Sequence, residues 1–434
     1  MRLSPLLMFL LAMLIPIPAV AAPPSLAPDQ ADRAVQEVIR LIEAHYVFPE
    51  KRAGIVAALK KAREAGRYNV ATPQELAERV TEDLFAASND GHLSLKFDVS
   101  EFEDIRRPRR GPEMSPFSVE NARRRNDGYE EMRVLSGNVR YVRVTNFIWY
   151  ETTARIVDAA ARFLADGDAV IVDLRGNGGG SADAVQRLIS YFFAKGGQEL
   201  IRFHDGLSGE TSVNRVLTSL PGPRLAGKPF FTLIDGNAAS AAEEFAYHVE
   251  QFKLGTLVGR TTAGAANNNR LYPVAPFFVA SISIGRPEHP VSRTNWEGKG
   301  IAPHIETPAP AALDQAHLLA LQALAQRATA ERRRGYDWDI AGLQARLKPV
   351  VLPPAALDAY VGTYGIRRVW RDGATLMFQR EQREPATMIP MGNDLFGLSH
   401  SPTVRLQFRR NGGRVTGFDQ VTKDGVVGTS ERTS

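Results

Sequence analysis

The sequence predicts an α/β protein with a helical N-terminal domain, an α/β core and a small antiparallel β module at the C-terminus. Between residues 29 and 88, apolar residues recur at helical spacing. In the middle of the chain, strongly apolar segments typical of buried strands run directly into helices. After residue 351 the pattern changes to period-two alternation with turn signals, which is typical of antiparallel strands. The length of 434 residues suits two or three domains.

The composition excludes several classes of protein. Hydrophobic residues make up 44% of the chain and charged residues 23%, which is the balance of a globular protein rather than a disordered or multi-span membrane chain. A net charge of +5 is too small over this length to indicate nucleic-acid binding, and no nucleic-acid-binding motif accompanies it. Cysteine is absent, so disulfides and thiolate nucleophiles are excluded. Any nucleophile must therefore be an oxygen or an amine.

Residues 1–21 have the pattern of a signal peptide. Arg2 gives a positive start, Leu6 to Ile15 form an apolar segment, and Ala19-Val20-Ala21 fits a cleavage site. A membrane anchor is the alternative, but the apolar segment is shorter than the roughly 20 residues that span a bilayer. Because no cysteine follows, a lipoprotein anchor is excluded, and no later stretch is apolar and long enough to be a transmembrane helix. We expect a periplasmic or secreted protein.

The helical N-terminal domain is expected over residues 22–98. The apolar spacing from Asp29 onward predicts a first helix, residues 55–65 fit a second, and Thr72 is placed to cap a third. Asn89 to His92 then forms a turn, and the alternating segment 93–97 is typical of a strand.

The α/β core is expected over residues 99–312. Residues 101–130 are charged and irregular, and we interpret them as a solvated connecting loop or as a flap beside an active site. Strands followed by helices come next, and strand ends that meet helix starts are where such sheets place their sites. The expected strands are 139–144, 169–174, 230–234, 256–259 and 277–284, and the expected helices are 152–164, 181–193 and 240–252.

The C-terminal part is expected to divide into a helical linker and a β module. Residues 313–350 form the linker, in which an Ala-, Leu- and Arg-rich segment predicts one helix over 313–333. Residues 351–434 form the module, with turn signals at Asp372-Gly373, Asn411-Gly412 and Asp424-Gly425.

Three polar residues are candidates for chemistry. Ser240 lies at the start of a helix after a buried strand, where it is either a plain helix cap or a nucleophile near helix amides that suit an oxyanion. His92 lies in a turn and is either structural or a general base. Glu297 follows the last core strand and is either an exposed loop acid or part of the site. No histidine spacing indicates a metal site.

The glycine run at 176–180 follows a buried strand. It lacks the spacing of dinucleotide-binding loops and the lysine of phosphate-binding loops. A tight strand-to-helix turn explains the glycines, and such a turn can also present backbone N–H groups to a substrate.

Taken together, these motifs resemble the tail-specific protease and tricorn-core serine peptidase family. The resemblance spans roughly residues 30–310, and it is similar to the branch of the interphotoreceptor retinoid-binding protein, which has a helical N-terminal domain and a Trp-Glu-Gly loop. The motifs that carry it, in order, are Asp90-Gly-His92, the segment Asp173 to Gly180, Ser240-Ala-Ala-Glu-Glu-Phe, Val258-Gly259 with Thr262-x-Gly264, and Asn295-Trp-Glu-Gly-x-Gly-x-x-Pro303.

The resemblance implies a crotonase-like or ClpP-like core with Ser240 as nucleophile, His92 as general base and Glu297 as supporting carboxylate. It also implies that the amides of Gly179 and Ala241 form the oxyanion hole. Two positions depart from the family. The processing-protease branch has a lysine base where this chain has Ala265, and tricorn has a serine before the histidine where this chain has Gly91. Histidine must therefore be the base, and its link to Glu297 is left open.

These observations predict an exported serine peptidase that acts through an acyl-enzyme on a peptide or protein substrate. A non-catalytic carrier of lipophilic ligands, or a scaffold on the same fold, is the first alternative, and an esterase is the second. No nucleic acid, metal, organic cofactor or integral membrane segment is expected. Because only about 40 residues separate Phe97 from Val139, no PDZ domain is expected either. The segment after residue 351 resembles a β domain often appended to bacterial hydrolases.

Overall fold

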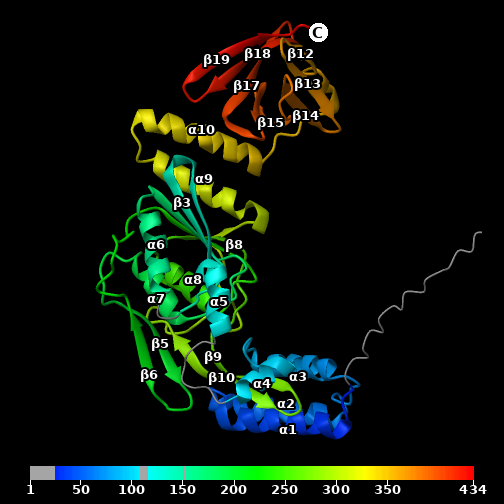
Figure 1. Ribbon diagram of the computed structural model, residues 1–434, viewed down its shortest axis with the longest axis vertical. Coiled ribbons are helices and arrows are strands. Elements are labelled where there is room, and N and C mark those ends of the chain that lie inside the picture. Colours follow the sequence, from blue (N-terminus) through cyan, green and yellow to red (C-terminus); the bar gives the residue numbers. More distant parts are fainter. Residues whose placement is uncertain (1–24, 108–115, 150–152) are drawn as a thin grey trace, which may run out of the picture.

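The computed structural model describes residues 25–107, 116–149 and 153–434. The expected signal peptide, residues 1–21, lies outside the described residues. The helical region, the α/β core and the β module follow one another along the long axis of the molecule, as Figure 1 shows. This arrangement agrees with the predicted fold class. Within the described ranges, no helix is both long and apolar enough to cross a bilayer.

Three helices build the N-terminal end: α1 (Pro28–His45), α2 (Pro49–Glu64) and α3 (Pro73–Ser88). Their apolar positions face one shared core, as the spacing predicts. The hydroxyl of Thr72 accepts the first-turn N–H of α3 at 3.3 Å, which confirms the expected cap. The helix ends where Asn89 adopts a left-handed conformation, with φ 54°, so the chain turns sharply into the segment that carries His92.

A twisted antiparallel sheet joins the helical region to the core. Its strands come from three parts of the sequence: β1 (Ser94–Phe97), β5 and β6, and the hairpin of β9 and β10 (Phe278–Glu288). The first residues of β10, Phe278–Ser281, pair with β1 of the helical region. Its last residues, Gly285–Glu288, pair with β5. Residues far apart in the sequence therefore meet at this junction. The remaining bounds are β5 Glu199–Asp205, β6 Thr211–Arg215 and β9 Asn268–Val274.

The core sheet has the strand order β11-β8-β7-β4-β3-β2, and all its neighbours are parallel except β2 with β3. Helices α6, α7 and α8 pack on one face, and α9 packs on the other. The strands β4 and β7 are buried along their whole length, which explains their unbroken apolar sequence. The bounds are β2 Tyr129–Leu135, β3 Val139–Val144, β4 Ala169–Asp173, β7 Phe230–Ile234, β8 Thr256–Gly259, β11 Ile305–Glu306, α6 Ala154–Ala165, α7 Ala182–Ser190 and α8 Ala241–Gln251.

Two expectations about helices are wrong in detail. The charged segment 101–130 is not a loop throughout, because it begins within α4 (Val99–Arg106) and contains α5 (Pro116–Arg124). The Asp98 carboxylate caps α4, and Phe102 is buried in an edge contact with the ring of Phe277, so a few residues anchor a mostly charged helix. Residues 108–115 lie outside the described residues, so the flap interpretation is not tested.

The second wrong expectation concerns the linker. The single helix predicted over 313–333 is two helices, α9 (Ala312–Ala325) and α10 (Ala330–Leu347). They pack against each other, and Arg346 pairs with Asp314 at 3.0 Å. Helix-forming residues continue across the break, so the sequence gives no stop signal there.

The C-terminal module is an eight-stranded antiparallel meander in which each strand pairs with the next. Backbone hydrogen bonds between Thr363 and both Thr433 and Ser434 join the first strand to the chain end, so the sheet is barrel-like. The predicted turns all join neighbouring strands. Aromatic side chains fill the interior. The bounds are β12 Gly362–Tyr364, β13 Arg367–Asp372, β14 Thr375–Arg380, β15 Ala386–Gly392, β16 Leu395–Leu398, β17 Ser401–Asn411, β18 Arg414–Thr422 and β19 Gly425–Glu431, with α11 Pro354–Asp358 before them.

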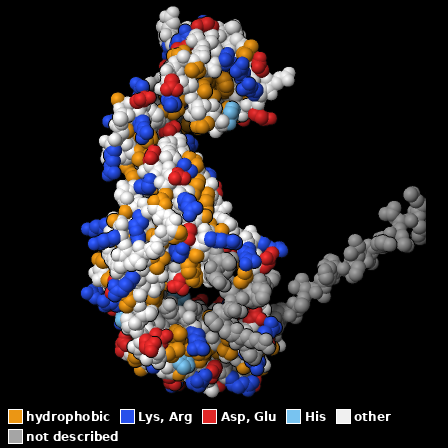
Figure 2. All heavy atoms as spheres, turned by 60° about the vertical axis from the view of Figure 1, so that its left-hand side comes forward, with side chains coloured by type: hydrophobic (Ala, Val, Ile, Leu, Met, Phe, Trp, Pro, Cys, Tyr) orange, Lys and Arg blue, Asp and Glu red, His pale blue; other side chains and the backbone are white. Residues whose placement is uncertain are grey.

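Figure 2 shows the distribution of charge on one face of the molecule. On this face, basic and acidic side chains are interspersed along the molecule rather than gathered by sign.

Candidate active site

Ser240 lies at the turn between the buried strand β7 and helix α8. Its φ of 53° is in the left-handed region, which is uncommon for a residue with a side chain and costs energy. The Ser240 N–H donates to the Glu243 carboxylate at 2.9 Å, and this contact holds the turn. The hydroxyl is therefore presented at the positive end of the α8 dipole, which is the position expected from the sequence.

The glycine run comes directly beside this serine. Gly179 has φ 111°, and a Cβ there would lie 2.7 Å from the Ser240 Cβ and 3.1 Å from the Ala241 nitrogen. No residue with a side chain fits such a close approach. The structure thus brings together Ser240, Gly179 and Ala241, which the sequence places about 60 residues apart.

The two amides expected to bind an oxyanion differ in their present contacts. In the described residues, the Ala241 N–H at the start of α8 has no acceptor. The Gly179 N–H donates to the Asn177 side-chain oxygen at 2.8 Å. Asn177 is buried, its side-chain nitrogen donates to the Val144 carbonyl, and its own carbonyl accepts the Ala239 N–H. Asn177 therefore couples the glycine run to the serine turn, a role that the sequence analysis missed.

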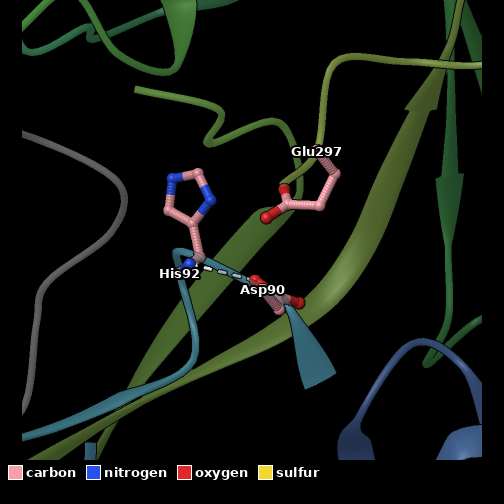
Figure 3. A group of neighbouring side chains, drawn as sticks. All are labelled: Asp90, His92 and Glu297. Carbon is pink, nitrogen blue, oxygen red and sulfur yellow. Dashed lines mark hydrogen bonds between the residues drawn. The ribbon is translucent and has the colours of Figure 1, made fainter. Parts of the chain in front are cut away.

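His92 lies in the turn between α3 and β1, next to two carboxylates. Figure 3 shows Asp90, His92 and Glu297 together, and one side-chain oxygen or nitrogen from each lies within 4.8 Å of the others. The backbone fixes His92 at both ends, because its N–H donates to Asp90 at 2.9 Å and its carbonyl accepts the Ser281 hydroxyl at 2.5 Å. The ring Nδ1 is buried without a hydrogen bond. The imidazole is therefore positioned by its backbone.

Glu297 answers the question raised by the missing serine. One of its oxygens accepts the Gly91 N–H at 2.8 Å, and the other accepts the N–H groups of Ala266 and Asn267 at 2.7 and 2.8 Å. The carboxylate is thus held beside His92 by three backbone amides. The contact on the histidine side is made by the backbone of Gly91, the residue that stands where tricorn has a serine.

The loop Gly264–Asn267 connects the serine turn with the histidine cluster. The Glu243 carboxylate accepts the first two N–H groups of this loop, at 2.7 and 2.8 Å, and Glu297 accepts the next two. Glu243 also accepts the Thr262 hydroxyl. Four consecutive amides are therefore shared between a carboxylate of the serine helix and a carboxylate of the histidine cluster. Ser240 and His92 are not directly hydrogen-bonded to each other.

Burial shifts the titration of these groups. Burial and the nearby charge of Asp90 together raise the pKa of Glu297 to about 7, although the three backbone amides oppose the rise. Burial lowers the pKa of His92, and Asp90 opposes this. Burial also raises the pKa of Glu243, against the hydrogen bonds that it accepts. At neutral pH the imidazole is therefore uncharged and able to take up a proton.

The cluster contains residue types that bind metal ions, and its hydrogen bonds bear on that possibility. Glu297 accepts three backbone N–H groups, and Asp90 accepts the His92 N–H, the Ser283 hydroxyl and the Asn267 side-chain amide. These six donors stabilise both carboxylates without a cation.

The sequence analysis assigned no role to Asp90, Asn177 or Glu243. Each lies inside a motif that carries the family resemblance. Each is a buried polar residue one to three positions from a predicted site residue. A single sequence does not show which polar residues are buried, so these three could not be singled out.

A serine on a strained turn at a helix start, beside a glycine loop and joined by one loop to a histidine–carboxylate cluster, defines a serine-type hydrolase site. The sequence-family comparison identifies the particular group. Residues 138–307 match the model of peptidase family S41, and residues 29–132 match the model described as the N-terminal domain of this family in eukaryotic IRBP, the interphotoreceptor retinoid-binding protein. The chain belongs to peptidase family S41, and it is a serine-type peptidase.

Solved structures of similar proteins have low sequence identity to this chain. The photosystem II D1 C-terminal processing protease is 14% identical, with 65% of this chain and 94% of that chain covered and a TM-score of 0.42. Mature CPAF is 12% identical, with 74% and 98% covered and a TM-score of 0.46. A putative peptidase from Parabacteroides merdae is 17% identical, with 64% and 90% covered and a TM-score of 0.44. The family assignment therefore depends on the two sequence-family matches.

Proposed function

We propose that this peptidase cleaves peptide bonds through an acyl-enzyme formed on Ser240. The observation that carries the proposal is the strained turn that presents Ser240 at the start of α8, against Gly179 and the unengaged Ala241 N–H. His92 takes the serine proton as the hydroxyl attacks the substrate carbonyl, and it then gives that proton to the leaving amine. In the second half of the reaction, His92 takes a proton from water as the water attacks the acyl-enzyme. The carboxylic acid product leaves, and the proton returns to Ser240.

Glu297 and the two amides stabilise the charges that develop in these steps. The Glu297 carboxylate lies beside the imidazole and balances its positive charge after proton uptake. The N–H groups of Ala241 and Gly179 are placed to bind the oxyanion, and the oxyanion competes with Asn177 for the Gly179 N–H. A negatively charged oxygen is a stronger acceptor than an amide oxygen, so the exchange is favoured in the transition state.

A fluorophosphonate probe tests the proposed nucleophile. Such a probe reacts covalently with an activated serine hydroxyl, so the wild-type protein should be labelled and Ser240→Ala should not. Mass spectrometry of the labelled peptide identifies the serine. Replacement of the exposed Ser208 by alanine is a matched control and should leave labelling unchanged. Equal labelling of wild type and Ser240→Ala would refute the assignment.

The segment between β1 and β3 leads to a prediction about substrate recognition. Its described residues contain α4, α5 and β2, and its length leaves no room for a PDZ domain. Without such a domain, this segment offers no PDZ groove to bind the free C-terminal carboxylate of a substrate. We expect free-acid and amidated forms of one peptide, cleaved at an internal bond, to have kcat/KM values within about threefold of each other. A large preference for the free acid would contradict this expectation.

We also propose that the protein is exported. This proposal rests on residues 1–21, whose charged start, apolar segment and small-residue site fit a signal peptide. The N-terminal sequence of the protein purified from a secreting host gives a direct test, because cleavage should leave Ala22 as the first residue.

A further inference from the structure

A small cavity lies against Ser240 and has a buried acid in its wall. The cavity has a volume of about 140 Å³, and its lining includes Ser240, Ala241 and Glu244 from the start of α8, together with Trp296 and the asparagines 267–269. The side chain of Glu244 is only 5% exposed. Ser240 at the turn before α8 and Glu244 in the first turn of α8 therefore face the same cavity.

Glu244 has no hydrogen bond or charged partner that accounts for its burial. Among the described residues, no lysine or arginine pairs with it, and its carboxylate accepts no hydrogen bond. The nearest basic side chain is His248, with Nε2 at 3.4 Å from the Glu244 oxygen but without hydrogen-bond geometry. Burial lowers the pKa of His248 to about 3, so this imidazole is uncharged and does not neutralise the acid.

The electrostatic surroundings of Glu244 are negative. Burial and the neighbouring charge of Asp183 raise the pKa of Glu244 to about 8. None of the described residues that line the cavity is a lysine, arginine or histidine. A buried carboxyl without a partner is costly, and a cation in the cavity would compensate both its burial and its repulsion from Asp183.

We propose that this cavity binds the side chain of the residue whose carbonyl Ser240 attacks, and that Glu244 selects a lysine there. The inference rests on the function proposed above. The cavity lies beside the nucleophile and the oxyanion amides, where this side chain must be placed. The cavity is small, with a volume of about 140 Å³, so it favours a slender side chain. The lysine side chain is unbranched and has five heavy atoms, whereas arginine has seven and ends in a planar fork, so we expect lysine to be preferred.

Peptide amides with a fluorescent leaving group test the proposal, because only the acyl side varies. The series should carry lysine, arginine, glutamine or norleucine at the last position. Norleucine keeps the carbon chain of lysine without the ammonium group. For the wild-type enzyme, we expect kcat/KM for lysine to exceed each of the others by at least about tenfold.

The variant Glu244→Gln removes the charge and keeps the shape. It should lower the ratio of lysine to norleucine by at least about tenfold, mainly through the lysine substrate. Glu250→Gln makes the same change further along α8, outside the cavity, and should leave the ratio unchanged. Fluorophosphonate labelling of Glu244→Gln confirms that the variant is folded and its serine reactive. If that variant is not labelled, the wild-type ratio measured between pH 6 and 9 takes its place. The ratio should rise with pH through about 8, where Glu244 becomes ionised while the lysine ammonium group stays charged.

The outcomes separate this inference from the proposed function. If Ser240 is labelled but norleucine or glutamine is cleaved as well as lysine, the lysine pocket is wrong and the peptidase mechanism stands. A lysine preference that Glu244→Gln leaves intact, or that stays constant between pH 6 and 9, would also overturn the inference. Absence of Ser240-dependent labelling in the wild type would instead refute the proposed function.

Discussion

Replacing either Ser240 or His92 by alanine is expected to lower kcat/KM by about 10⁴-fold or more. Neither side chain belongs to the hydrophobic core, and His92 is fixed mainly through its backbone, so both variants should fold normally. The two residues act as one unit in a single proton transfer. The double variant should therefore be little slower than either single variant.

Hydrolysis of a fluorogenic peptide measures these effects, and thermal unfolding confirms the fold. The variant His400→Ala provides a control, because this histidine is exposed on the β module, far along the chain from the site. A Ser240→Ala enzyme that keeps full activity would rule out the mechanism. If the effects of the two single variants multiply in the double variant, the residues do not act in one step.

The variant Glu297→Gln is expected to lower the maximal rate by about 10²-fold or more and to shift the pH profile. Glu297 supports the imidazolium only when ionised, and its pKa is raised to about 7. The wild-type rate should therefore rise with pH through about 7. In the variant only His92 titrates, and its pKa is lowered by burial, so the remaining rate should rise below pH 6.5.

The difference between the two profiles comes from the titration of Glu297. Here the carboxylate itself titrates in the neutral range, because it is buried next to Asp90. Rate measurements between pH 5 and 9 on both enzymes test the prediction. Glu306→Gln, which makes the same change at an exposed position, should leave the profile unchanged. An identical profile for wild type and Glu297→Gln would contradict the assignment.

The sequence predicted the helices and strands whose side chains are buried on one face or on all faces. The run Ala169–Asp173 is buried at every position, and its apolar sequence identifies a central strand without ambiguity. The strand Asn268–Val274 was missed because most of its side chains are exposed on both faces, which leaves no alternation to detect. Its position is set by pairing with β10, which is a tertiary effect.

The same reasoning explains which site residues could be predicted. Ser240 and Gly179 lie at a strand-to-helix junction, where topology alone indicates a site. Glu243 gives no comparable signal, because an acid in the first turn is common in any helix. Three of its four hydrogen bonds come from residues 262–265, about 20 positions further along the chain, and only the folded structure shows them.

The residues of the candidate site come from distant parts of the chain, so they are added at different times during synthesis. His92 is synthesised 148 residues before Ser240 and 205 residues before Glu297. The loop Gly264–Asn267 donates hydrogen bonds to both Glu243 and Glu297, so neither carboxylate alone orders it. Until residue 297 has been added and its loop has folded, the segment Gly264–Asn267 lacks the contacts of one of its two carboxylates. In the mechanism proposed above, a shorter chain therefore contains Ser240 and His92 without the complete support of the imidazole.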